Sequence, residues 1–206
     1  LEGFKKFNET FSRPDDKEVE NWTYLLHSCK FGNSQIVQAL LEKGADLNVQ
    51  DSNGKPSLYW ASCHEDGEES TRICKLLIEK GVDVNQRAED GRTALLGAVI
   101  SDNYKTLEVL LEAGSDPNLQ GDKGISALYL AASKSAEAVK MLLKHKADPN
   151  IEVMNKATPI FEAAWSDGVE IIKDLVEAGA DMNHEIKTED GQKLYPLDTA
   201  ITEDSM

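Results

Sequence analysis

Apolar residues recur along the chain in short groups, and each pair of groups is followed by a polar turn. One group, Ile36, Val37, Leu40 and Leu41, has the spacing of one face of a helix. A shorter apolar group precedes it, after Thr23, whose hydroxyl can cap the first N–H groups of a helix. The pattern therefore predicts pairs of short helices, each pair closed by a turn.

This paired pattern occurs five times, and each second helix ends in a related motif. The five motifs are LLEKGADLN (40–48), LLIEKGVDVN (76–85), LLEAGSDPN (110–118), LLKHKADPN (142–150) and LVEAGADMN (175–183). Their closing asparagines are separated by 37, 33, 32 and 33 residues. A fixed period of this kind indicates a repeat architecture, in which each unit buries its apolar face against its neighbours.

Glycine stands where four of the second helices are expected to stop, at Gly44, Gly81, Gly114 and Gly179. Glycine adopts the left-handed backbone of a helix end without a steric penalty. In the fourth repeat Lys146 takes this place, and lysine reaches the same conformation at modest cost.

A second motif begins each repeat. It reads TYLLHSC (23–29), PSLYWAS (56–62), TALLGAV (93–99), SALYLAA (126–132) and TPIFEAA (158–164). These segments resemble the T-P-L-H-x-A-A motif of the ankyrin-repeat family, and with the G-A-D-x-N ends the resemblance covers almost everything from residue 21 to 200. It implies an all-α fold: an ankyrin-repeat solenoid of stacked helix-turn-helix units with β-hairpin fingers.

The chain departs from the family motif in one regular way, because no repeat has the motif histidine. Its place is taken by Leu26, Tyr59, Leu96, Tyr129 and Phe161. In the family this histidine fastens one repeat to the next by hydrogen bonds, so apolar and aromatic packing is expected to replace it here.

The predicted organisation is an N-terminal capping segment, 1–20, followed by a repeat domain over 21–200. The expected repeats are 18–50, 51–87, 88–120, 121–152, 153–189 and a partial repeat, 190–206. Phe4, Phe7 and Phe11 have the spacing of one helical face, which predicts a helix that covers the first repeat.

Three length changes interrupt the period. The second repeat has three extra residues between its helices, around 65–70, and the finger after Asn183 is longer than the others, over 184–194. In the fourth repeat the turn between the helices is expected to be one residue short. Insertions of this kind normally lie on one face of a repeat array and are candidates for function.

The chain is strongly acidic, with 37 acidic and 22 basic residues and a formal net charge of −15. This charge repels phosphate backbones and anionic lipids, so it disfavours nucleic acid and membranes and favours a partner with basic segments. The sequence has no apolar run long enough to span a bilayer and no secretory signal at its start. A cytoplasmic location is expected, with the nucleus as the alternative.

The resemblance implies that a partner lies on the concave face, against the finger turns and the inner faces of the first helices. The matching positions chosen as candidates are Trp22, Phe31, Asn53, Lys55, Cys63, His64, Asp90, Arg92, Ile125, Met154, Lys156 and Trp165. Large apolar side chains among them would concentrate binding energy. The alternative is packing between repeats, which is favoured for Phe31 and Ile100, and Trp60 is expected in the core.

No catalytic activity, cofactor or metal is expected. The only local cluster of nucleophile, base and acid types is Cys63-His64-Glu65-Asp66, whose members point in different directions along a helix end. A zinc site from Cys63, His64 and Cys74 lacks a fourth ligand. The segment 51–54 begins like a calcium loop, but its glycine comes too early, so a turn is expected.

The sequence therefore predicts a protein-protein interaction module within a larger scaffold, adaptor or regulatory protein. The alternatives are a structural spacer or self-association module, a fragment of a host-targeting bacterial effector, and an enzyme regulatory domain. The family resemblance also implies hydroxylation of Asn85, because Leu77 stands eight residues upstream of it. The alternative role of Asn85 is to hydrogen-bond its own hairpin.

Overall fold

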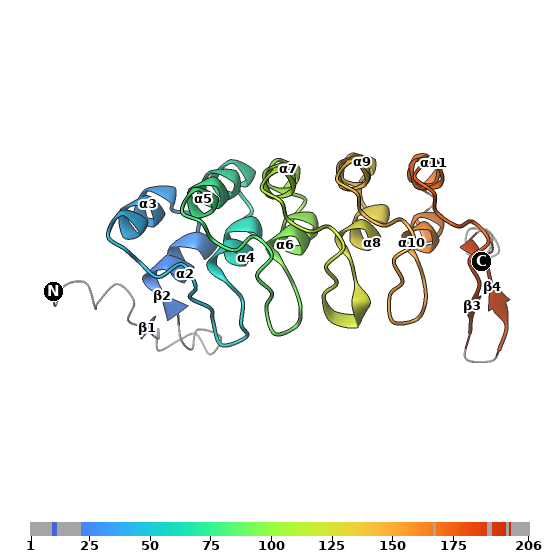
Figure 1. The fold of residues 1–206 in the computed structure, drawn as a ribbon, viewed down its shortest axis with the longest axis horizontal. Coiled ribbons are helices and arrows are strands. Elements are labelled where there is room, and N and C mark those ends of the chain that lie inside the picture. Colours follow the sequence, from blue (N-terminus) through green and yellow to red (C-terminus); the bar gives the residue numbers. More distant parts are fainter. Residues whose placement is uncertain (1–9, 12–21, 167, 189–190, 197, 199–206) are drawn as a thin grey trace. The chain divides into compact units, whose positions relative to one another are not determined.

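The computed structural model describes residues 10–11, 22–166, 168–188, 191–196 and 198 (Figure 1). The chain divides into two compact units, Leu1–Ser115 and Asp116–Met206. Both consist mainly of paired helices joined by turns. The all-α fold is confirmed, whereas a single repeat domain over 21–200 stays a prediction.

In the first unit, the described residues form paired helices in two rows. The pairs are α2 (Tyr24–Lys30) with α3 (Ser34–Glu42), α4 (Ser57–Ser62) with α5 (Gly67–Glu79), and α6 (Ala94–Ile100) with α7 (Tyr104–Glu112). Helix α4 packs between α2 and α6, and α5 packs between α3 and α7. The turns between pairs extend away from the second row as fingers (Figure 1).

The second unit repeats this plan and adds a hairpin. It contains the pairs α8 (Ala127–Ala132) with α9 (Ala136–Lys144) and α10 (Pro159–Trp165) with α11 (Val169–Glu177), preceded by a short turn, η2 (Asp122–Gly124). The long final finger forms the antiparallel strands β3 (Ile186–Lys187) and β4 (Lys193–Leu194). Of the predicted sixth repeat, residues 191–196 and 198 are described: β4 lies within them, Pro196 and Asp198 are helical, and the other residues lie outside the described part of the chain.

Hydroxyl side chains begin several of the first helices, as their sequence position predicts. Thr23 accepts a hydrogen bond from Leu26 N at 3.3 Å, and Ser126 accepts one from Tyr129 N at 3.2 Å. Pro159 occupies the first turn of α10, where its missing N–H has no helical acceptor to lose. Each first helix therefore starts at the residue that its motif marks.

The core lies where first helices meet. The aliphatic residue at the third position of each motif is at most 2% exposed; these residues are Leu25, Leu58, Leu95, Leu128 and Ile160. Burying one such side chain stabilises a fold by about 1.5–3 kcal/mol. At the place of the missing histidine, Leu26, Tyr59, Leu96 and Phe161 are buried, so apolar and aromatic packing replaces it there, whereas Tyr129 is half-buried.

The motif asparagines connect neighbouring repeats. Asn118 Nδ2 donates to Lys146 O at 3.2 Å, and its Oδ1 accepts from Asp148 N at 2.7 Å. Asn150 makes the same pair of bonds to Gly179 O and Asp181 N, at 2.9 and 2.8 Å. The G-A-D-x-N motif thus ends one helix and also holds the end of the next.

The insertion near 65–70 is not a loop, contrary to expectation. Helix α5 has 13 residues, whereas α7 has nine, and its first turn includes Gly67 to Ser70. Asp66 caps this extra turn, because its Oδ1 accepts from Glu68 N at 3.0 Å and Glu69 N at 3.2 Å. The added residues therefore lengthen a helix.

Two further expectations were wrong. The turn between α8 and α9 has three residues, as the turn between α6 and α7 does, and the missing residue comes from α8, which has six residues where α6 has seven. Phe11 is not helical but lies in strand β1 (Thr10–Phe11), paired with Trp22 of β2 (Trp22–Thr23). Phe4, Phe7 and the rest of the predicted cap lie outside the described residues.

The helix ends confirm the left-handed turns predicted from glycine. Gly44, Gly81, Gly114 and Gly179 have φ between 79° and 97°, and Lys146 has φ 67°. Only in the fourth repeat does this turn strain a side chain, because a left-handed residue with a Cβ costs roughly 1–2 kcal/mol.

Replacing Lys146 by glycine should raise the stability of the chain. We expect Lys146→Gly to increase the free energy of unfolding by about 1 kcal/mol, because glycine removes the Cβ penalty and the turn is unchanged. Urea denaturation of the wild type and the variant measures this difference. A decrease in stability would show that the lysine side chain contributes more than its backbone strain costs.

Gly97 allows α4 and α6 to approach closely. A Cβ at this position would lie 2.4 Å from Ser62 Oγ and 2.8 Å from Cys63 Sγ. Both distances are too short for van der Waals contact, so the absence of a side chain at 97 decides how near the two helices lie.

Gly97→Ala should therefore destabilise the chain by about 1–3 kcal/mol, although alanine is the better helix former. Thermal or urea denaturation measures the loss. In a double-mutant cycle, Ser62→Ala should recover part of it, since it removes the atom nearest the new Cβ. If the stability losses of Gly97→Ala and Ser62→Ala simply add in the double variant, the new Cβ does not clash with Ser62 Oγ.

Two of the three cysteines are buried in the first unit. Burial raises the pKa of the Cys29 thiol and of the Cys74 thiol, and for Cys74 the neighbouring Cys29 and Cys63 raise the pKa further. Both thiols therefore stay protonated in the folded chain under conditions in which free thiols ionise.

Alkaline solution should weaken the fold through these thiols. Their folded-state pKa is raised, so their contribution to stability is complete below the unfolded pKa, about 8.5, and is lost as pH rises toward the folded value. Each thiol should lower the free energy of unfolding by about 1.4 kcal/mol per pH unit in that window. Denaturation at several pH values measures this slope, and Cys29→Ala/Cys74→Ala should have a shallower one; equal slopes would contradict the assignment.

Candidate functional site

The residues predicted to bind a partner lie in finger turns and at the ends of first helices. In the first unit, Asn53 and Lys55 belong to one finger and Asp90 and Arg92 to the next, while Cys63 and His64 follow α4. In the second unit, Ile125, Met154 and Lys156 lie in fingers and Trp165 ends α10. Each unit thus carries its own part of the predicted surface.

Large apolar side chains are exposed at the C-terminal ends of three first helices. Phe31, at the end of α2, is 57% exposed, Ile100 of α6 is 40% exposed, and Trp165 of α10 is 61% exposed. The alternative that Phe31 and Ile100 pack between repeats is therefore not supported. The side chain of Trp22 lies outside the described residues, and a groove running through both units stays a prediction.

Trp60 is a functional candidate that the sequence placed in the core. One side of its ring packs on Leu26, and its Nε1 donates to Asp51 Oδ2 at 3.1 Å. Nevertheless, Lys30 Nζ lies over the indole at 4.7 Å from the ring centroid and Lys55 Nζ at 5.2 Å. Cation–π attraction therefore gathers two ammonium groups on one half-buried indole.

The finger beside this cluster adds a third cation. The Nε of Arg92 lies 3.4 Å from Asp90 Oδ2, and the neighbouring phenol of Tyr59 raises the pKa of the Arg92 guanidinium. Burial is the main cause that raises the pKa of Tyr59 to about 12, so the phenol stays protonated at a pH at which a free tyrosine ionises. Asp90 and Arg92 form a partly exposed ion pair, in which each partly neutralises the charge of the other.

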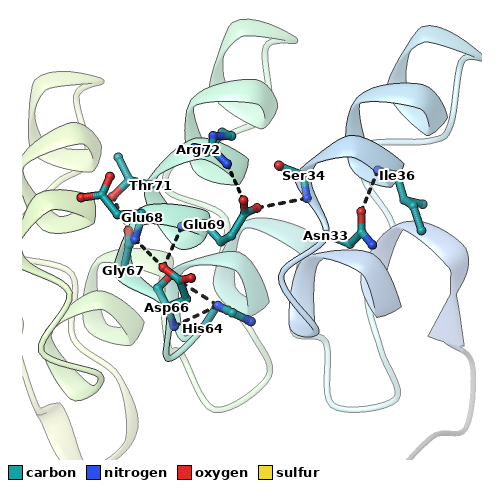
Figure 2. A network of polar contacts seen from close by, with 10 residues as sticks. All are labelled: Asn33, Ser34, Ile36, His64, Asp66, Gly67, Glu68, Glu69, Thr71 and Arg72. Carbon is teal, nitrogen blue, oxygen red and sulfur yellow. Dashed lines mark hydrogen bonds and ion pairs between the residues drawn. The ribbon is translucent and has the colours of Figure 1, made fainter.

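The inserted turn of α5 joins two repeats through polar contacts (Figure 2). Glu69 Oε2 accepts a hydrogen bond from Ser34 N at 3.2 Å, at the start of α3, and its other oxygen pairs with Arg72. Asn33 caps α3 by accepting from Ile36 N at 3.1 Å. The insertion therefore fastens α5 to the neighbouring hairpin, which gives it a structural role.

The Cys63-His64-Glu65-Asp66 segment does not form a catalytic arrangement. His64 Nδ1 accepts a hydrogen bond from Asp66 N at 3.1 Å (Figure 2), and the ring packs on Gly32, where an added Cβ would lie 2.1 Å from Nε2. Burial raises the pKa of the Cys63 thiol, which disfavours the thiolate that nucleophilic attack requires. The histidine therefore contacts backbone atoms.

Asn85 takes the structural position of the other motif asparagines. Its Nδ2 lies 3.5 Å from Gly114 O, and its backbone N donates to Asp83 Oδ1 at 2.9 Å. These contacts support the role of Asn85 in holding the next helix end, whereas its hydroxylation stays a prediction.

Other kinds of site find no support in the described part of the chain. No group of three or more His, Cys, Asp or Glu residues there is arranged to hold a metal ion. The segment 51–54 is a turn, in which Asp51 Oδ1 accepts from Asn53 N and Lys55 N, both at 2.9 Å. Among the described helices, none is long and apolar enough to cross a bilayer.

Comparison with known proteins gives a family match over most of the chain. The family model described as ankyrin repeats (3 copies) matches three times, over residues 6–88, 25–121 and 95–186. Together these matches include all the helical hairpins described above.

Similar segments occur in proteins of diverse organisms. The chain is 32% identical over 122 residues to a putative ankyrin repeat-containing protein of Treponema pallidum, which covers 59% of the chain and 40% of that protein. It is 29% identical over 173 residues to Rabankyrin-5 of Mus musculus, covering 82% of the chain and 14% of that protein. Alpha-latrocrustotoxin-Lt1a of Latrodectus tredecimguttatus is 32% identical over 110 residues, 52% of the chain and 7% of the toxin.

The chain thus corresponds to less than half the length of each of these relatives. What it shares with them is the repeat itself. The period of the asparagines, the paired helices with their fingers and the family match agree, and the chain belongs to the ankyrin-repeat family.

Proposed function

We propose that this chain binds a protein or peptide partner on a surface made of its finger turns and the C-terminal ends of its first helices. Ankyrin repeats generally serve as protein-protein interaction modules. The partner-binding residues are the exposed candidates described above in each unit.

The observation that carries the proposal is the exposure of aromatic side chains on this surface. Phe31 and Trp165 are 57% and 61% exposed at equivalent ends of α2 and α10. Aromatic residues contribute large contact areas to interfaces and are frequent among the side chains that dominate binding energy. Solvent exposure of such residues costs free energy in the unbound chain, which a partner recovers.

We also propose that the chain has no catalytic activity of its own. The one segment with nucleophile, base and acid types places His64 against backbone atoms and keeps Cys63 protonated. A binding role agrees better with this arrangement than a reaction does.

Net charge and local charge indicate different partners. The formal charge of −15 favours a partner with basic segments over the chain as a whole. Around Trp60, however, Lys30 and Lys55 present ammonium groups, and the nearby carboxylate of Asp51 is occupied by the indole and the backbone. We propose that basic segments of a partner contact the acidic remainder of the surface and not this cluster.

Substitution of the exposed aromatic side chains should abolish partner capture. In affinity capture from a cell lysate, read by mass spectrometry, Phe31→Ala/Trp165→Ala should lose proteins that the wild type retains, because the loss of contact area weakens binding by about tenfold or more. The matched control is Ile36→Ala/Val169→Ala, which removes two exposed apolar side chains from second helices.

The control variant should retain the same proteins as the wild type. Equal capture by all three chains would assign the aromatic residues a structural role and make the chain a spacer. Circular dichroism of each variant confirms that the repeats remain folded.

A further inference from the structure

A hollow opens beside two fingers of the second unit. Its volume is about 480 Å³, within the range of roughly 300–1,000 Å³ typical of ligand sites. The residues that line it are Lys123, Ile125, Tyr129, Val153, Met154 and Asn155. Most of this lining is apolar, and Met154 is the most exposed large apolar residue among those described, at 76%.

Hydrogen bonds between the fingers hold the walls of the hollow. Met154 N donates to Lys123 O at 2.8 Å, which joins the two finger tips. Gln120 Nε2 donates to Gly124 O at 2.6 Å within one finger and to Glu152 O at 2.8 Å in the next. The hollow is therefore formed before a ligand arrives, which lowers the entropy cost of binding.

The finger tips carry backbone strain beside the hollow. Lys123 has φ 57° and Lys156 has φ 68°, both in the left-handed region. In the fingers of the first unit, Gly54 and Gly91 take the place that Lys156 has here. Lysine costs more than glycine in this conformation, and strain of this kind is concentrated at sites that bind ligands.

The polar groups that the hollow offers are hydrogen-bond donors. Within the described part of the chain, Lys123 forms no ion pair, whereas Lys156 Nζ is occupied by Glu152 Oε2 at 2.7 Å. Asn155 Oδ1 accepts from Ala157 N at 3.2 Å, which leaves its amide N–H groups to donate. Burial, together with the nearby carboxylate of Glu162, raises the pKa of Tyr129, so its phenol stays protonated.

We propose that this hollow binds a peptide segment of a partner protein in which a large apolar side chain stands beside an acidic residue. The apolar side chain packs against Ile125, Val153 and Met154, and the carboxylate accepts hydrogen bonds from Lys123 and Asn155. The proposal rests on the proposed function and adds to it the chemistry of the partner at one place.

A peptide carboxylate suits this site better than a nucleic acid does. Only Lys123 brings an ammonium group without a carboxylate partner to the hollow, and Asp122 and Glu152 lie close to it in the sequence of the same fingers. A phosphate backbone brings repeated charges, which these carboxylates and the net charge of −15 repel. A peptide brings one carboxylate to Lys123, and its apolar side chain packs against the apolar residues that line the hollow.

Selection of a random peptide library displayed on phage, with the full chain as bait, tests the proposal. We expect the enriched peptides to place Asp or Glu beside Leu, Ile, Met, Phe or Trp. Synthetic copies with a fluorescent label then give affinities by anisotropy. Lys123→Glu and Met154→Ala should each weaken binding by about tenfold, through charge repulsion and lost apolar contact.

Two matched controls separate the hollow from general effects of substitution. Lys146→Glu reverses the charge of another lysine of the same unit that has a left-handed backbone conformation. Met182→Ala removes another exposed methionine side chain, which is 47% exposed. Both should bind the peptides within about twofold of the wild type. A peptide with lysine in place of its acidic residue should prefer the Lys123→Glu variant to the wild type.

Other results would overturn the proposal. Enriched peptides without an acidic residue, or binding that Lys123→Glu and Met154→Ala leave unchanged, would exclude this occupant of the hollow. If Phe31→Ala/Trp165→Ala alone abolished peptide binding, the proposed function would stand and the hollow would not be its site. If no peptides were enriched, the hollow would be excluded as a peptide-binding site. If the chain formed a dimer that Met154→Ala converts to a monomer, the occupant of the hollow would be a second copy of the chain.

Discussion

Each helical hairpin of this chain has apolar surface that only a neighbouring hairpin can bury. The aliphatic side chains that meet this constraint, such as Leu25, Leu58 and Leu128, are almost completely inaccessible, and the glycine at 97 lets α4 and α6 approach within contact. The motif asparagines add directional bonds from one repeat to the next helix end. Because these residues are committed to stacking, recognition is left to finger turns and helix ends.

Charge on this chain is distributed locally in a way that its total conceals. Carboxylates outnumber cations, yet several already accept hydrogen bonds from the chain itself: Asp51 from a turn and from Trp60, Asp66 from the first turn of α5, and Glu69 from the neighbouring hairpin. Meanwhile, Lys30 and Lys55 lie over the ring of Trp60, and Lys123 lies at a finger tip of the second unit. The net charge therefore predicts general behaviour toward polyanions, while the recognition of one residue depends on its immediate neighbours.

The repeats could be predicted almost completely from the sequence, because a period of about 33 residues, a capping hydroxyl and a terminal glycine are local signals. The insertion was assigned to a loop because length alone does not distinguish a longer turn from a longer helix; the capping of α5 by Asp66 decides this. Phe11 had helical spacing, but its backbone pairs with Trp22 as a strand, a contact that periodicity does not contain. The motif position of each candidate binding residue was enough to place it on a finger or a helix end. The solvent exposure of its side chain could not be predicted in this way.

The sequence by itself determined the fold class, the starts of the first helices and the turns that end the second helices, since each depends on residues within one repeat. Only the tertiary structure decided which apolar side chains remain exposed, because exposure depends on how neighbouring repeats cover one another: Phe31 and Ile100 stay open while Trp60 is half-covered. It also decided that two fingers line one hollow, since Lys123 and Met154 are far apart in the chain and meet only through a bond between their finger tips.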